Sequence, residues 1–198
     1  MTGAADIEKR SVAGEIETRA TGKRSTVAGY AAVFGESANI GDSFYETIAP
    51  GAFTNTLKTA DVRAYYGHDS RRLLGRISAG TLRLKQDTKG LAVEIDLPDT
   101  TDGRDVRELI DRGDISGMSF GFQVLKETWD ETSNMSHRTI HEVELIEVSV
   151  VASPAYQGTS VALRSLEKAR LDGAASFEAV SYRLKLQAEV KLRLAGIG

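Results

Sequence analysis

The stretch ISGMSFGFQV, residues 115–124, alternates as one β-strand with two unlike faces. Successive side chains of a strand point to opposite faces, so Ser119 lies on one face with Gly117 and Gly121 as its neighbours. The other face is apolar and should meet the core: Met118, Phe120, Phe122 and Val124. Glycine inside a strand often marks the close approach of a ligand or another backbone. Two interpretations follow: a nucleophilic hydroxyl on a floor where Gly117 and Gly121 bind an extended peptide, or a small-residue patch under a covering loop.

The same Gly-x-Ser-x-Gly spacing occurs in the nucleophile elbow of the α/β-hydrolases. That motif needs a turn from a strand into a helix, with the serine at the turn. Here the serine lies inside a continuing strand, so the spacing does not predict a hydrolase elbow.

Strand patterns dominate the chain on both sides of this stretch. Alternating or apolar runs bounded by turn residues predict strands near 15–20, 25–34, 61–66, 82–85, 91–97 and 139–152. One helix is expected, capped by Thr101 or Asp102 and ended by Gly113. From about residue 160 onward the composition shifts to helical spacing. The sequence therefore predicts a mainly β core with one central helix, followed by a helical tail.

Composition excludes several classes of protein. The 198 residues carry a net charge of −3 and contain no cysteine, which excludes disulfide frameworks, thiolate metal sites and cysteine nucleophiles. A near-neutral balance argues against nucleic-acid binding, which needs a basic surface. No apolar run is long enough to span a bilayer, and the opening residues MTGAADIEKRSVAGE do not form a secretory signal. We expect no cofactor and a cytoplasmic protein.

A nucleophilic serine needs a base, and the chain has three histidines. His68 ends a predicted strand, where its side chain could reach across a sheet end, although an ordinary loop histidine fits the same position. His137 and His141 are four residues apart, which would suit a metal on a helix. Their segment has a strand pattern instead, so no metal site is predicted.

The strand around VELIEVSVVA carries a carboxylate in an apolar run. Simple alternation places Glu147 on one face with Leu145 and Ser149, and Glu144 on the opposite face. A carboxylate on an apolar face is costly unless it is paired. A histidine would satisfy Glu147, and a structural ion pair with an arginine such as Arg76 or Arg104 is the alternative.

Six motifs in order resemble those of the tailed-phage prohead maturation proteases. They are GYAAVF (29–34), IAPGAF (48–53), GHD (67–69), LGR (74–76), GRDVRELIDRGDISGMSFGF (103–122) and ELIEVSVVASPAY (144–156). The resemblance covers roughly residues 27–164 and implies a protease domain over 27–164, after an N-terminal strand or tail (1–26) and before a helical extension (165–198). It also implies the fold of herpesvirus assemblin, a closed antiparallel β-barrel flanked by helices.

The resemblance implies a serine endopeptidase with Ser119 as nucleophile and His68 as base. Its third member falls on Glu147, with His141 as a rival because assemblin-like enzymes carry a second histidine on the equivalent strand. The implied substrates are scaffold, the scaffolding segment of the major capsid protein and finally the protease itself, inside the prohead in the host cytoplasm. The sequence leaves the oligomeric state open, with a homo-oligomer as one alternative. A non-enzymatic scaffold or capsid-binding module on the same fold, and an esterase-like hydrolase, are the alternatives.

Overall fold

The computed structural model describes residues 7–13, 16–21, 24–132, 134–152 and 162–173. In chain order the elements are β1 (Glu8–Ala13), β2 (Glu17–Thr21), β3 (Arg24–Val33), β4 (Ser37–Ile40), β5 (Phe44–Ile48), α1 (Thr56–Thr59), β6 (Arg63–Tyr66), β7 (Asp69–Arg76), β8 (Leu82–Gln86), β9 (Gly90–Asp96), α2 (Thr101–Asp111), β10 (Gly117–Asp130) and β11 (His137–Val151). Residues 162–173 are helical, in a unit (Ser160–Gly198) distinct from Met1–Thr159. The rest of the predicted tail lies outside the described residues.

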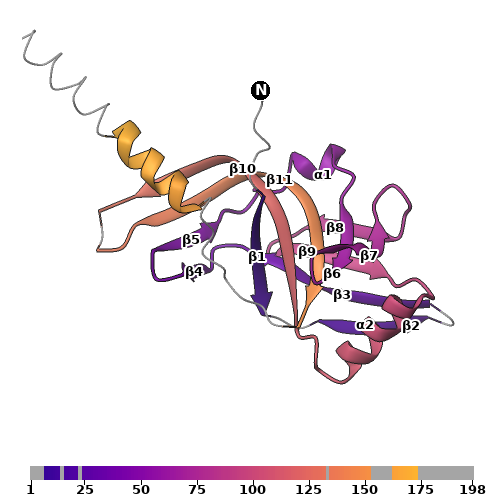
Figure 1. Ribbon diagram of the computed structural model, residues 1–198. Coiled ribbons are helices and arrows are strands. Elements are labelled where there is room, and N and C mark those ends of the chain that lie inside the picture. Colours follow the sequence, from indigo (N-terminus) through magenta and orange to yellow (C-terminus); the bar gives the residue numbers. More distant parts are fainter. Residues whose placement is uncertain (1–6, 14–15, 22–23, 133, 153–161, 174–198) are drawn as a thin grey trace, which may run out of the picture. The chain divides into compact units, whose positions relative to one another are not determined.

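The strands form two open sheets (Figure 1). One has seven strands, ordered β1-β10-β11-β5-β4 with β6 beside β11 and β7 beside β6, and the other has four, ordered β2-β3-β9-β8. The expected closed antiparallel barrel is wrong: among the described residues the end strands of each sheet do not pair with one another. The reason is β11, in which residues 137–140 pair in parallel with β5 and residues 147–150 pair in parallel with β6, so the sheet branches instead of closing.

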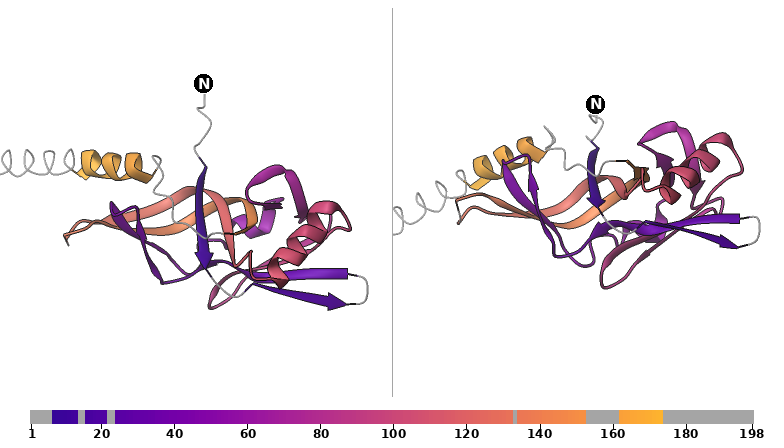
Figure 2. Two further views of the ribbon diagram at one scale, coloured as in Figure 1. Left: turned by 60° about the horizontal axis from the view of Figure 1, so that its bottom comes forward. Right: turned by 90° about the horizontal axis from the view of Figure 1, so that it is seen from below.

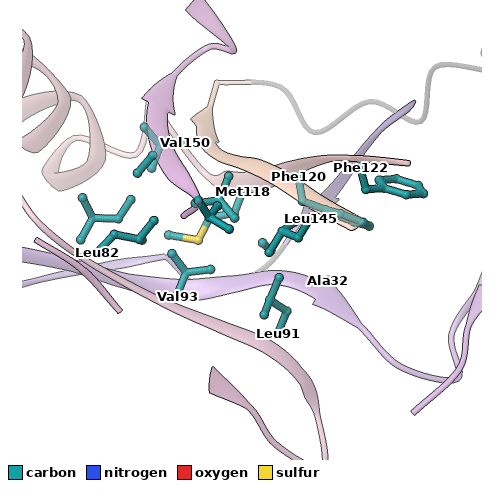
Figure 3. Packing of buried hydrophobic residues seen from close by; sticks show 14 of the residues in the cluster. Ala32, Leu82, Leu91, Val93, Met118, Phe120, Phe122, Leu145 and Val150 are labelled. Carbon is teal, nitrogen blue, oxygen red and sulfur yellow. The ribbon is translucent and has the colours of Figure 1, made fainter. Parts of the chain in front are cut away.

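The core lies between the facing sides of the two sheets. Met118, Phe120 and Leu145 of the larger sheet face Leu91 and Val93 of the smaller one (Figure 3). The apolar face predicted for β10 is confirmed, since Met118 and Phe120 are buried. Burying a side chain of this size stabilises the fold by roughly 2 kcal/mol. This packing fixes which face of β10 turns away from the core, and Ser119 lies on that other face.

The predicted helix is α2, which leads the chain into β10. The cap is Thr100 and not the predicted Thr101 or Asp102, which lie inside the helix: the Thr100 side chain accepts a hydrogen bond from the Gly103 N–H at 3.3 Å. Gly113 takes a φ of +83° just after the helix, a conformation that favours glycine. Figure 2 shows α2 running beside β2, and a side-chain hydrogen bond joins Thr18 to Asp111 there. Among the described residues, no helix combines the length and the apolar character that crossing a membrane demands.

Strand β1, which the sequence patterns did not predict, is an edge strand held by buried charges. Its Arg10 donates to Glu46 of β5 at 2.6 Å, and its Glu8 accepts two hydrogen bonds from Arg138 of β11, both at 2.9 Å. All four side chains are buried. Burial is the largest single effect on the pKa of Glu8, and it raises the pKa. The hydrogen bonds and charges of Arg138 and Arg10 together outweigh burial, so the pKa of Glu8 lies below its ordinary value. These four residues tie the side chains of β1 to β5 and β11, while the backbone of β1 pairs with β10.

Candidate active site

Ser119 lies inside β10, between two neighbouring strands. It is opposite Ser149 of β11 on one side and opposite Ser11 of β1 on the other. Strand β10 continues unbroken from Gly117 to Asp130, so the serine is part of a strand and not of a turn into a helix. Its side chain is fully buried, with 0% exposure.

His68 occupies the two-residue turn that joins β6 to β7. Gly67 and His68 both have positive φ, +61° and +62°, as the type I′ turn favoured in two-residue hairpins requires. Tyr66 pairs with Asp69 across the turn, and β6 lies parallel to β11 beside residues 147–150. The turn therefore presents the imidazole at the end of β6, next to β11.

Three side chains meet at this point through two contacts of hydrogen-bond length. The His68 Nε2 atom is 2.8 Å from the Ser119 Oγ atom, and the His68 Nδ1 atom is 2.6 Å from the Glu147 Oε1 atom. The His68 and Glu147 side chains are 16% and 12% exposed, so these contacts are largely shielded from water. A hydroxyl, an imidazole and a carboxylate in this order have the geometry of a serine–histidine–acid triad.

The face predicted for Glu147 was right in grouping it with Ser149 and wrong in grouping it with Leu145. Leu145 pairs with Phe122 and Glu147 pairs with Gly121, so Ile146 is an extra residue in β11. Such a bulge reverses the alternation. Leu145 therefore points into the core, and Glu147 lies with Ser119 on the opposite face. Simple alternation cannot reveal a bulge.

The bulge also changes the position of Glu144, which alternation had placed on the face opposite Glu147. Glu144 pairs with Gln123, two residues from Gly121 on β10, so Glu144 and Glu147 lie on the same face of the sheet. Glu144 is exposed, and its partner Gln123 lies farther along β10 from Ser119 than Gly121, the partner of Glu147. Distance along the strand, not the face, separates it from the triad.

Gly121 lies directly beneath the Glu147 side chain. A Cβ atom at position 121 would stand 2.7 Å from the Glu147 Cγ atom and 3.0 Å from its Oε1 atom. The sequence interpretation placed a peptide over this glycine, and in the structure the carboxylate occupies the space above it. Gly117, the other predicted peptide-binding glycine, pairs with Ala13 of β1 and Val151 of β11.

Gly121→Ala is therefore expected to displace the carboxylate from His68 and lower kcat by about 10²-fold, as a misplacement of about 1 Å can do. The measurements are the steady-state kcat for cleavage of the capsid protein and, separately, stability from urea unfolding. Gly75→Ala is the matched control, because its Cβ would meet the Thr81 carbonyl at 2.9 Å, away from the triad. We expect Gly75→Ala to lose stability without this loss in kcat. Equal kcat in the two variants would show that the added Cβ at position 121 does not displace the Glu147 carboxylate.

The backbone of β1 also contacts the serine. Ser119 Oγ donates to the Arg10 carbonyl oxygen at 2.7 Å. A hydroxyl has one proton to donate, so it cannot donate to the Arg10 carbonyl and to His68 Nε2 at the same time. Lys9, the residue before it, places its Nζ atom 3.9 Å from Glu147 Oε1. The described conformation thus has β1 lying against the triad.

The other two histidines lie outside the triad. The His137 Nε2 atom is 2.8 Å from the Thr47 hydroxyl, and the His141 Nε2 atom is 2.8 Å from the Thr128 hydroxyl. In the described part of the chain no group of three or more metal-ligating side chains is gathered. Arg76, the proposed alternative partner of Glu147, bonds Asp61 at 2.7 Å, and Arg104 bonds Asp99 at 2.7 Å.

Comparison with known proteins gives three similarities. Residues 14–172 match the family of caudovirus prohead serine proteases. The prohead protease of Enterobacteria phage HK97 is 32% identical over 153 residues, which cover 75% of this chain and 64% of that protein. The chain thus spans less than two thirds of that relative's length. The capsid assembly protease of bacteriophage T4 shares the fold, with a TM-score of 0.53 and 12% identity over 75% of this chain and 98% of that one.

Proposed function

The chain belongs to the caudovirus prohead serine protease family, and from this membership and the triad geometry we propose that it is a serine endopeptidase of capsid maturation. The observation that carries the proposal is the pair of contacts that joins Ser119 through His68 to Glu147, at 2.8 and 2.6 Å. A capsid-binding module without activity would have no need of this ordered contact.

The proposed reaction assigns one role to each side chain. Ser119 Oγ attacks the scissile carbonyl while His68 Nε2 takes the hydroxyl proton. His68 then returns this proton to the leaving amine, and water repeats the cycle on the acyl-enzyme. Glu147 accepts the Nδ1–H hydrogen bond, which holds the imidazole in the tautomer with a free Nε2 lone pair and stabilises the imidazolium.

The proposed substrates are capsid and scaffold proteins of the prohead. The similar proteins are a prohead protease and a capsid assembly protease by name. We extend this substrate class to the present chain, including the scaffolding segment of the major capsid protein, the chain itself and a place of action inside the prohead. Contacts to the peptide are proposed along β10 between Gly117 and Gly121. The test is cleavage of the major capsid protein expressed together with this chain, followed by intact-mass spectrometry.

Substrate attack requires that β1 move away from Ser119. The serine is fully buried, and its hydroxyl donates to the Arg10 carbonyl. An extended peptide that pairs with this edge of β10 would need the position that β1 now occupies. The β1-docked arrangement is therefore proposed as a resting state.

Tying β1 to β10 is expected to silence the protease reversibly. Val12 of β1 lies opposite Met118 of β10, and the chain has no cysteine, so Val12→Cys with Met118→Cys introduces a single disulfide pair. We expect the oxidised variant to cleave capsid protein at least about tenfold more slowly than its own reduced form, since the disulfide holds the strands within about 7 Å between Cα atoms. Equal rates in the two redox states would show that β1 does not obstruct the site.

A further inference from the structure

The backbone of His68 is held in a conformation that residues other than glycine seldom adopt. Its φ is +62°, in the left-handed region, where a Cβ atom crowds the backbone. Such a conformation persists only where surrounding contacts impose it. The direction of the imidazole follows from this backbone, so whatever holds the turn also aims Nε2 at Ser119.

Strand β11 binds both N–H groups of the turn. The Gly67 N–H donates to the Val150 carbonyl oxygen at 3.0 Å, and the His68 N–H donates to the Ser149 Oγ atom at 3.2 Å. The first contact is backbone to backbone and survives any substitution. The second depends on one hydroxyl, and Ser149 is buried, with 1% exposure.

Ser149 and Glu147 are two residues apart on the same strand, and both contact the same histidine. Glu147 binds the ring at Nδ1, and Ser149 binds the backbone N–H. Two contacts from one strand hold His68 at its ring and at its backbone N–H. Ser149 also lies directly opposite Ser119 in the register of β10 and β11, so the strand that holds His68 is hydrogen-bonded to the strand that carries the nucleophile.

We infer that Ser149 is a positioning residue: its hydroxyl holds the His68 backbone in the left-handed conformation that aims Nε2 at the Ser119 hydroxyl. The expected effect on catalysis rests on the proposed function. The expected effect on the His68 backbone rests only on the hydrogen bond between Ser149 and the His68 N–H. The hydrogen bond assigned to Ser149 goes to the His68 backbone N–H and not to the imidazole or to the Ser119 hydroxyl. It acts through His68.

The test compares Ser149→Ala and Ser149→Cys with the wild type on the capsid-protein substrate. Both variants remove the strong acceptor, and the cysteine keeps nearly the size of the serine with only a weak acceptor. We expect kcat to fall by about 10- to 100-fold with KM nearly unchanged, because misaligned groups slow the chemical step without weakening peptide binding. Ser149→Cys supplies the result if the alanine variant does not fold.

Thr56→Val is the matched control. Thr56 is buried and its Oγ1 atom accepts the Leu145 N–H at 2.9 Å, so it is also a buried hydroxyl that accepts a backbone N–H, at another point along β11. We expect Thr56→Val to lose stability in urea like Ser149→Ala and to keep wild-type kcat per folded molecule. A kcat loss that only follows the folded fraction in both variants would overturn the positioning role.

A measurement without substrate separates this inference from the proposed function. NMR of the free protein reports the His68 Nδ1–H resonance, which depends on the hydrogen bond to Glu147. We expect this resonance to broaden or shift in Ser149→Ala and Ser149→Cys and to stay unchanged in Thr56→Val. If the wild type cleaves nothing while the resonance responds in this way, the proposed function fails and the positioning contact stands. An unchanged resonance and an unchanged kcat in both Ser149 variants refute the positioning role.

Discussion

Replacing Ser119 with alanine is expected to lower kcat for capsid-protein cleavage by about 10⁶-fold, the usual cost of losing a triad nucleophile. No other hydroxyl is bonded to the His68 Nε2 atom among the described residues. The measurement is intact-mass spectrometry of the major capsid protein after incubation with each variant. Processing at a near wild-type rate would show that the nucleophile lies elsewhere.

The same substitution is expected to leave the fold in place at a measurable cost. Ser119 lies on the face of β10 that turns away from the core, yet it is buried and donates to the Arg10 carbonyl. Losing a buried hydrogen bond of this kind costs about 1 kcal/mol, so Ser119→Ala should unfold at slightly lower urea. Circular dichroism of the variant would separate a folded inactive protein from an unfolded one.

Ser116 provides the matched control for the nucleophile. It is exposed and lies between α2 and the first residue of β10. Ser116→Ala is therefore expected to cleave at the wild-type rate. An inactive Ser116→Ala beside an active Ser119→Ala would exchange the two assignments.

The sequence patterns predicted strands such as β8, whose apolar residues alternate, and missed β1, β4, β5 and β7. Strand β8 was predicted from Leu82 and Leu84, because a half-buried strand needs only its alternation. Strand β1 has the sequence EKRSVA and buries Glu8 and Arg10. Charged residues inside a fold depend on partners far along the chain, here Glu46 and Arg138, and no local pattern contains these partners.

The residues of the candidate site could be predicted from the sequence, but the contacts between them could not. The face of Ser119 followed from local alternation in β10, whereas the contact with His68 spans 51 positions and was implied only by the family resemblance. The bulge at Ile146 separates Glu147 from Leu145, with which alternation had grouped it, and brings Glu144 onto its face. The prediction of a closed barrel was wrong for a related reason. Strand β11 pairs with both β5 and β6, which lie far from it in the sequence, and no local pattern indicates this pairing.

Glu147→Gln is expected to lower kcat by about 10³- to 10⁴-fold, less than the loss of the serine. The amide keeps the shape of the carboxylate and removes its charge. A glutamine can also turn its NH₂ group toward His68 Nδ1, and the ring would then carry its proton on Nε2. In that tautomer Nε2 has no lone pair to accept the Ser119 proton. The expected signature is a low kcat in a protein that unfolds at nearly the wild-type urea concentration.

Two substitutions on the same strand test whether this loss is specific to Glu147. Glu144→Gln removes the same charge from an exposed position on the same face, and His141→Ala removes the rival third member, whose Nε2 atom contacts Thr128 instead. Both are expected to keep activity within about twofold of the wild type, since neither contacts His68 and most exposed substitutions are nearly silent. All three variants must be measured on one substrate, because a change in substrate would confound kcat. An inactive His141→Ala beside an active Glu147→Gln would transfer the third position to the histidine and leave the 2.6 Å contact between Glu147 and His68 as a structural pair.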